Sequence, residues 1–290
     1  MPNVTGTTAD IFIDEKWSPE LNRAIEFDIV IFPLFSDWSK RLSGSGDIYH
    51  LPARHHLTAS TKSAGTDATP EAITETQQNF TVSTHQIAAQ TIEDFAEVMS
   101  KYDIRAEYTM EYSYALARAR DVAAAALLDD NTTQTVGVLT AELTADSLSR
   151  AWQYGVASGA KGSGKGVVSP ACWGGLLKVE KFTNQLFNGD TGGKALHMAQ
   201  IGKLYSSTFY VSQLTVGTAP NSSGHLWWGD HFFQITKRRP TLHQWYSPLA
   251  TAWVVSADQI FGVFERLEAD EAAAVTTTAR LHGVRLQTLK

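Results

Sequence analysis

The chain has little of what marks secreted, membrane-spanning or nucleic-acid-binding proteins. Its single cysteine, Cys172, excludes an internal disulfide and is typical of a reducing compartment. No apolar run reaches the roughly 18 residues of a membrane-spanning helix. The N-terminal sequence lacks the basic and apolar regions of a signal peptide, so we expect no export by that route. The net charge is −6, and no run of Lys or Arg supplies the electrostatic footprint of a dedicated nucleic-acid binder.

Signatures of catalysis are missing as well. The sequence contains no GxSxG, HExxH or CxxC motif and no paired carboxylates that would indicate acid–base chemistry. Cys172 is better explained as a small buried apolar residue than as a nucleophile. We therefore predict no enzymatic activity, no catalytic residue, no cofactor and no metal site.

One glycine-rich segment, Gly159 to Gly166, comes close to a phosphate-binding loop. Gly166 stands where the Ser or Thr that holds magnesium must be. The order of elements also differs, because this loop follows a predicted helix and precedes a strand at Val167 and Val168, whereas a phosphate loop follows a strand and opens a helix. We interpret it as a solvent-facing loop. Nucleotide binding by the purified chain would favour the alternative, a nucleotide-dependent enzyme.

Histidines cluster twice without the spacing of a metal site. His55 and His56 are adjacent and would point to opposite faces of a strand, while His50 and His56 would lie about 20 Å apart. We expect hydrogen bonding at an interface there. The segment Gly224 to His231 is interpreted as a strand bearing aromatic side chains, with His225 and His231 on one face.

Residues 44 to 86 are long, polar and poor in large apolar side chains. Both ends alternate like half-buried strands, with Tyr49 and Leu51 on one side of the first and Phe80 and Val82 marking the second. Between them, residues 60 to 79 offer only Ile73 as a large aliphatic side chain. Such a hairpin is marginal alone in water. We predict that it lies on a neighbouring copy of the protein.

The strongest helix signal runs from Asp103 to Asp129, without Gly or Pro. Its predicted inward face is Ile104, Tyr108, Tyr112, Ala115, Leu116, Ala119, Val122, Ala123, Ala126 and Leu127. At 290 residues and 43% hydrophobic composition the chain can bury a sizeable core.

Shorter elements are predicted around this helix. A capping box at Thr91 to Asp94 predicts the start of a second helix. Thr144 is the predicted N-cap of a third helix, whose Leu148, Ala151 and Trp152 would face inward. Ser169-Pro170 predicts the start of a fourth helix. The apolar run IVIFPLF is predicted to dock on a core, LYSSTFYVS to form a strand, and HLWWGDHFFQIT, LATAWVV and IFGVFERL to form core strands.

Several sequence segments along the chain are similar to those of one protein family. TADIFIDEKWSPELNRAIEFDIVIFPLF resembles the opening arm of tailed-phage major capsid proteins of the Hong Kong 97 type. VVSPACWGGLLKVEKFTNQLFNGD, followed by IGKLYSSTFYVSQL, resembles their apical-domain core, and QIFGVFERLEADEAAAVTT their final strand pair. The resemblance covers nearly the whole chain and depends on the order of these segments.

The resemblance implies an α+β fold with an N-terminal arm over residues 1–43 and an extended β-hairpin loop over 44–88. A peripheral domain would comprise 89–131 and 236–290, with a spine helix at 103–129, and an α/β apical domain would comprise 132–235. The implied contacts between subunits fall on Trp17, Tyr49, Leu51, Leu57, Lys62, Phe80 and Val82. A minority of the family cross-links a loop lysine, but nothing in this sequence supports that chemistry at Lys62.

The implied function is a shell of hexamers and pentamers that encloses double-stranded DNA in the virion of a tailed phage. The chain would form homo-oligomers in the host cytoplasm, hold DNA non-specifically, contact no membrane, and use a separate scaffolding protein, portal and decoration proteins. An encapsulin-like cellular compartment of the same fold is the alternative within the family. An extracellular adhesion protein is a further alternative, and the missing signal peptide argues against it.

Overall fold

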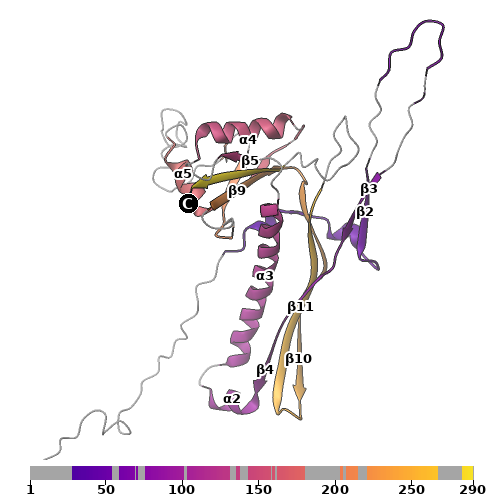
Figure 1. The fold of residues 1–290 in the computed structure, drawn as a ribbon. Coiled ribbons are helices and arrows are strands. Elements are labelled where there is room, and N and C mark those ends of the chain that lie inside the picture. The colour runs from indigo at the N-terminus through magenta and orange to yellow at the C-terminus, as the bar shows by residue number, and fades with distance from the viewer. Residues whose placement is uncertain are drawn as a thin grey trace, which may run out of the picture.

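The computed structural model describes residues 28–53, 59–68, 70, 76–100, 103–130, 135–137, 143–157, 159–160, 162–179, 203–204, 207–214, 221–266 and 283–289. They form an elongated molecule with a long sheet and helix, a compact α/β unit at one end, and a two-stranded hairpin that projects from the same end (Figure 1). Residues 1–27, which include Trp17, lie outside the described part.

A four-stranded sheet forms the long part of the subunit, in the order β1-β10-β11-β4. Its strands are β1 (Ser36–Asp37), β4 (Thr84–Glu93), β10 (Phe232–Ser247) and β11 (Ala252–Glu265). The register of β10 against β11 shifts between Thr236 and Thr241, around Pro240, because proline cannot donate to a strand ladder. Phe232, Phe233 and Phe261 are buried, which confirms the predicted core strands.

The long helix α3 (Ile104–Asp130) lies along one face of this sheet, over β11 and β4 (Figure 1). It begins and ends within one residue of the prediction and spans about 40 Å. Tyr112 and Leu116 are buried as predicted. The predicted face is wrong farther along, where Ala115, Val122 and Ala126 are exposed. The buried residues of this second half are Asp121, Ala124, Ala125 and Leu128.

Helix α2 (Asp94–Met99) begins later than the predicted capping box. The strand β4 continues through Glu93, because Glu93 pairs with Ala252 of β11. Thr91 is therefore part of the ladder and does not cap the helix. Tertiary strand pairing has overridden a local cap signal.

The compact unit is built on a six-stranded sheet in the order β5-β12-β9-β6-β8-β7. Its strands are β5 (Thr135–Gly137), β6 (Gly164–Val168), β7 (Lys203–Leu204), β8 (Ser207–Val211), β9 (Asn221–Trp228) and β12 (Gly283–Leu289). The predicted single strand LYSSTFYVS is thus divided between β7 and β8, which pair antiparallel. The predicted boundary also changes, because 283–289 joins this sheet and not the long one.

Two helices pack on the six-stranded sheet, α4 (Ala145–Ala157) and α5 (Pro170–Leu177). Both predicted caps are confirmed: Thr144 Oγ1 accepts from the Ser147 N–H at 3.3 Å, and Ser169 Oγ accepts from the Cys172 N–H at 3.2 Å. Trp152 was predicted to face inward but is exposed, and Gly155 takes the buried place against the Trp228 ring.

The apolar run before the hairpin docks on the core, as predicted. It forms the short helix α1 (Ile31–Leu34), whose Ile31 and Phe32 are buried with Phe35. The 3-10 helix η2 (Ser39–Leu42) follows and packs against β10.

Candidate functional site

The projecting hairpin consists of β2 (Ile48–Ala53) and β3 (Thr76–Thr81), paired antiparallel. Its base rests on the chain's own core. Phe80 and Val82 are 7% and 6% exposed, in a cluster with Trp38, Phe233 and Ile235. The Phe80 ring meets the Phe233 ring edge to face at 4.9 Å between centroids. The hairpin was predicted to lie on a neighbouring copy, but its base packs on the core of its own chain.

The outer part of the hairpin is different, because residues 59–68 are all exposed. Lys62 lies in this stretch, whereas Leu57, His55 and His56 lie outside the described residues. Tyr49 and Leu51 are half-buried at the base. His50 Nδ1 lies 2.6 Å from Asn79 Oδ1 across the two strands. Contact of the seven predicted residues with another subunit stays a prediction.

The glycine-rich segment has a structural role that differs from nucleotide binding. Its last residues belong to β6, where Gly164 and Gly166 pair with β8 and β9. A Cβ atom at Gly166 would lie 2.6 Å from the Phe209 ring. Lys165 Nζ donates to the Leu34 carbonyl at 2.7 Å, at the end of α1. Lys165 thus fastens α1 to the six-stranded sheet, and the interpretation as a solvent-facing loop is wrong for Gly164 and Gly166, which are buried in β6.

The two histidines of the Gly224–His231 segment do not share a strand face. A turn at Gly229, with φ of 61°, separates β9 from β10. His225 is buried with its Nε2 3.2 Å from Asp129 Oδ1, whereas His231 Nε2 lies 3.0 Å from Glu265 Oε1. Each histidine is held by a different carboxylate.

His225 lies where the C-terminal end of α3 meets the six-stranded sheet. Burial lowers the pKa of His225, although the hydrogen bond and charge of Asp129 oppose this shift. Arg285 of β12 donates to the Asp129 carbonyl at 3.3 Å, and its positive charge lowers the His225 pKa further. A cation at a helix C-terminus is favoured by the helix dipole. This arrangement joins the helix to the compact unit.

Two buried polar side chains join α3 to other elements. The Asp121 carboxylate is 0% exposed and accepts from the backbone N–H of Phe32 at 2.7 Å and of Val30 at 3.2 Å. Gln259 of β11 is also 0% exposed. It donates to the Leu116 carbonyl at 2.8 Å and accepts from Arg120 Nε at 2.6 Å. The sequence reasoning missed both residues, because a lone Asp or Gln carries no motif.

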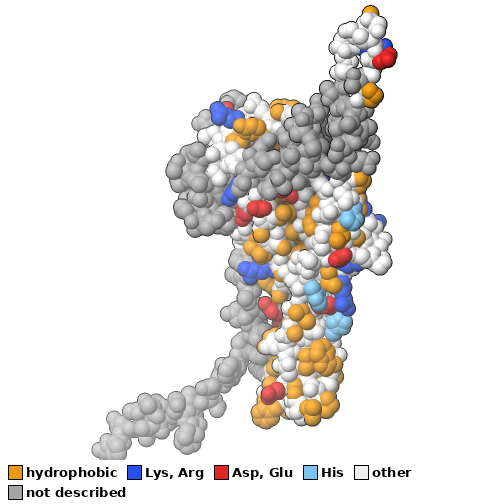
Figure 2. All heavy atoms as spheres, turned by 45° about the vertical axis from the view of Figure 1, so that its right-hand side comes forward, with side chains coloured by type: hydrophobic (Ala, Val, Ile, Leu, Met, Phe, Trp, Pro, Cys, Tyr) orange, Lys and Arg blue, Asp and Glu red, His pale blue; other side chains and the backbone are white. Residues whose placement is uncertain are grey.

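A charged cluster lies on the sheet face opposite α3. Asp258 is 5% exposed and contacts His85 at 3.2 Å, His243 at 3.1 Å and Arg238 at 2.9 Å. Burial raises the pKa of Asp258, but the hydrogen bond from His85 and the nearby Arg238 and His243 outweigh it, so the pKa lies below its ordinary value. Figure 2 shows histidine side chains close to Lys or Arg side chains on this long part of the molecule.

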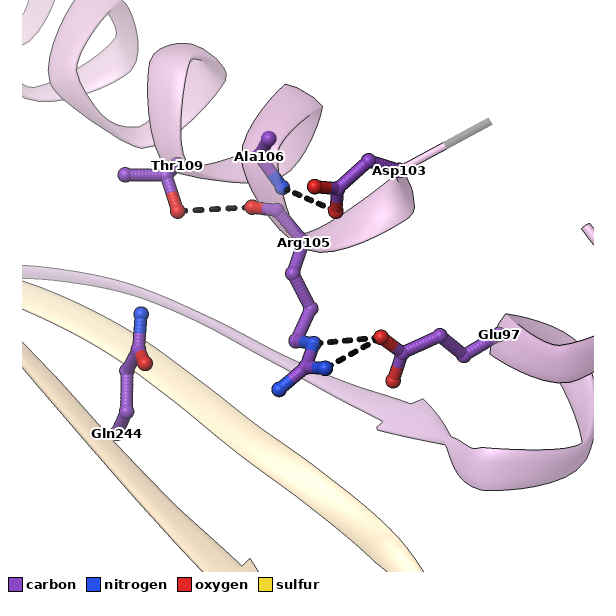
Figure 3. A pocket seen from close by; sticks show the side chains of 6 residues that line it. All are labelled: Glu97, Asp103, Arg105, Ala106, Thr109 and Gln244. Atoms are coloured by element: carbon purple, nitrogen blue, oxygen red, sulfur yellow. Dashed lines mark hydrogen bonds and ion pairs between the residues drawn. The ribbon is translucent and has the colours of Figure 1, made fainter. Parts of the chain in front are cut away.

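One open pocket of about 500 Å³ lies between α2, the start of α3 and β10 (Figure 3). Its polar groups satisfy one another: Arg105 binds Glu97 at 2.5 Å, and Asp103 accepts from the Ala106 N–H at 3.1 Å. The Thr109 hydroxyl donates to the Arg105 carbonyl. The pocket presents no nucleophile beside a base and has the features of a structural ion pair at a helix start.

Chemistry elsewhere in the described residues is similarly sparse. Cys172 is buried, and burial raises the pKa of its thiol, which makes the thiolate scarce. The described ranges hold no group of three or more His, Cys, Asp or Glu side chains placed to bind a metal. Within the same part of the chain, no helix is both long and apolar enough to cross a membrane.

Comparison with known proteins identifies the fold. No protein-family model and no curated protein matches the sequence. A structure of Mycobacterium phage Che8 matches with a TM-score of 0.78 and 18% identity, over 95% of this chain and 97% of that chain. The capsid of cyanophage P-SCSP1u matches with a TM-score of 0.70 and 17% identity, over 100% and 97%. The mature capsid of bacteriophage PhiM1 matches at 0.72 and 14%, over 95% and 92%. The chain therefore has a mixed helix-and-sheet fold shared with phage capsid chains.

Proposed function

We propose that this chain is the major capsid protein of a tailed bacteriophage, with the Hong Kong 97-type fold. Subunits would form hexamers and pentamers of an icosahedral shell around double-stranded DNA. The observation that carries the proposal is the likeness to phage chains over nearly the full length of both partners. The exposed stretch 59–68 supports it, because an isolated subunit has no use for a long projecting loop, whereas a neighbouring copy can cover it.

The parts of the family fold are assigned on the same basis. We assign residues 1–43 to the N-terminal arm and 44–83 to the extended loop, because residues 84–88, expected in the loop, belong to β4 of the long sheet. The long sheet with α3 is the peripheral domain, and the six-stranded sheet with α4 and α5 is the apical domain. The C-terminal strand β12 goes with the apical domain, because it pairs with β9 and β5.

The proposed partners are other copies of the chain, with a separate scaffolding protein, portal and decoration proteins as further partners. The protein would belong to the virion after assembly in the host cytoplasm, would hold DNA non-specifically and would have no enzymatic activity. Trp17, Tyr49, Leu51, Leu57 and Lys62 are the proposed intersubunit contacts. Phe80 and Val82 belong to the same proposal, but their burial within the subunit limits them to supporting the loop.

Negative-stain microscopy of the expressed protein tests the proposal. We expect closed particles or rings of capsomer size. A protein that stays monomeric at high concentration, with and without co-expressed neighbouring phage genes, would contradict it. Particles that contain a host enzyme and no nucleic acid would instead favour the encapsulin-like alternative, which the phage capsid neighbours do not favour.

A further inference from the structure

The end of the long sheet farthest from the compact unit exposes several large apolar side chains. Phe95, Val98 and Met99 of α2 are 71%, 80% and 70% exposed, and Leu249 in the β10–β11 turn is 102% exposed. Figure 2 shows hydrophobic side chains gathered at this lower end. We define the apolar tip as Phe95, Val98, Met99, Tyr246 and Leu249, and leave out Trp245, whose side chain lies on the opposite face of the sheet from Tyr246.

The apolar tip is contiguous and large. The Asp94 N–H donates to the Thr251 carbonyl at 3.0 Å, and the Tyr246 hydroxyl donates to the Asp94 carboxylate at 2.8 Å, so α2 and the turn are held together. Five residues with these exposures present roughly 700 Å² of accessible surface, more than the largest apolar patch of a typical monomer and close to one partner's share of a standard interface. Such a surface is expected to be covered by another protein surface.

Charge around the apolar tip is predominantly negative. The hairpin end from 242 to 257 contains no Asp, Glu, Lys or Arg. The segment from 93 to 107 carries five acids against two bases; the acids are Glu93, Asp94, Glu97, Asp103 and Glu107, and the bases are Lys101 and Arg105. A surface that covers the tip is therefore expected to be basic at its rim.

The same chain carries a basic band beside the middle of β10. We define it as Lys40, Arg41, Lys237, Arg238 and Arg239. Lys237 Nζ donates to the Leu42 carbonyl at 3.1 Å, which brings the η2 and β10 parts of the band together. Lys40, Arg41, Arg238 and Arg239 are exposed. Arg238 is paired with Asp258 at 2.9 Å, so the exposed positive charge of the band comes mainly from Lys40, Arg41 and Arg239.

Tip and band of one subunit cannot neutralise each other. Tyr246 of the apolar tip is seven positions along β10 from Arg239 of the band, about 23 Å at normal strand rise. This exceeds the screening length of about 8 Å at physiological salt. Favourable pairing of the two surfaces therefore requires two copies.

We propose that the apolar tip docks on a second copy of this chain, with its acidic rim facing the basic band of that copy. The contact joins two different surfaces and is head-to-tail, the class that generates rings and extended arrays. The inference rests on the proposed function in naming which surfaces of the subunit meet in the shell.

Two pairs of variants test this contact in the full-length chain. Leu249→Gln removes apolar surface from the tip, and Met110→Gln is its matched control, because Met110 is 57% exposed on α3. We expect Leu249→Gln to raise the protein concentration needed for association about tenfold, as for loss of an interface anchor, with unchanged melting. Met110→Gln should leave both unchanged. Equal association of the two variants would overturn the proposal.

A charge swap tests the partner surface. Glu93→Lys and Arg239→Glu should each weaken association about tenfold, and the double variant should return to within about threefold of the wild type. Glu111→Lys, an exposed charge on α3, serves as control. A double variant no better than the singles would refute the pairing of tip and band. Sedimentation separates this proposal from the proposed shell function. If the protein forms only small oligomers and the variants weaken their association, the contact is supported and the shell is contradicted. If the protein forms shells whose assembly the variants leave unchanged, the shell is supported and the contact is contradicted.

Discussion

Asp121 is the residue on which the docking of the N-terminal segment depends most directly. Its buried carboxylate replaces the helix partners that the N–H groups of Val30 and Phe32 lack at the start of α1. The contact joins residues about 90 positions apart in sequence. No local pattern could predict it, because an Asp in the middle of a helix is usually solvated.

Replacement of Asp121 by Ala should destabilise the subunit by about 2–3 kcal/mol, because buried N–H groups lose their acceptor. Glu111→Ala on the exposed side of the same helix is the control and should stay within about 0.5 kcal/mol. Urea unfolding of both variants measures the difference. Equal midpoints would show that water replaces the carboxylate without cost.

His225 should make stability depend on pH in mild acid. Burial holds its folded-state pKa below the ordinary 6.5, so the unfolded chain takes up a proton first as pH falls. The contribution of His225 is therefore complete above about pH 6.5 and is lost progressively below it, toward the folded-state pKa.

The His225 contribution can be isolated by comparing wild type with His225→Gln between pH 7.5 and 5. The free energy of unfolding of wild type should fall more steeply with acid than that of the variant. Met110→Gln, which changes an exposed side chain and removes no titratable group, is the control and should follow the wild-type slope. Parallel curves for wild type and His225→Gln would contradict a buried neutral imidazole.

Among the elements, α3 shows how far periodicity reaches. Its ends and its first buried face follow from an uninterrupted helical pattern. Its second half is rich in Ala, and an Ala-rich stretch carries almost no preference for one face. Contacts with α1 and Phe261 determine which face is buried, and Ala124, Ala125 and Leu128 lie on that face.

Helix α4 is fitted to the sheet by Gly155. A Cβ atom there would lie 2.5 Å from the Trp228 ring, whereas a Cβ atom at Gly174 of α5 meets nothing within 4 Å. Gly155→Ala should therefore destabilise the protein by about 1–3 kcal/mol through overpacking. Gly174→Ala should stabilise it by up to about 1 kcal/mol, because Ala favours a helix. The melting temperatures of the two variants check this prediction. A higher melting temperature for both would mean that the Trp228 ring moves to accommodate the added methyl group.

At the scale of the whole molecule, the projecting hairpin has two parts with different stability. The base belongs to the subunit, since Phe80 and Val82 pack with Trp38 and Phe233. The exposed stretch 59–68 makes little contribution to the core. In an assembly, contacts with neighbouring copies would stabilise the conformation of this stretch.

Deletion of Ser60 to Asp67 should leave the subunit folded with its melting temperature within a few degrees, and should abolish closed particles. Replacing the same residues by a Gly/Ser linker of equal length keeps the loop length and removes the side chains. We expect this variant also to form no closed particles, because the side chains make the contacts between copies. Microscopy and calorimetry provide the two measurements. Normal particles from the deletion would show that the loop is dispensable for assembly.

The sequence by itself determined the extent of α3, the caps at Thr144 and Ser169, and the absence of familiar catalytic motifs. These depend on local chemistry, which a window of residues contains. Only the tertiary structure decided that β4 runs through the capping signal at Thr91, that β12 joins the six-stranded sheet, and that Lys165 binds the Leu34 carbonyl. Each depends on partners distant in sequence, whose pairing free energy exceeds a local preference of about 1 kcal/mol.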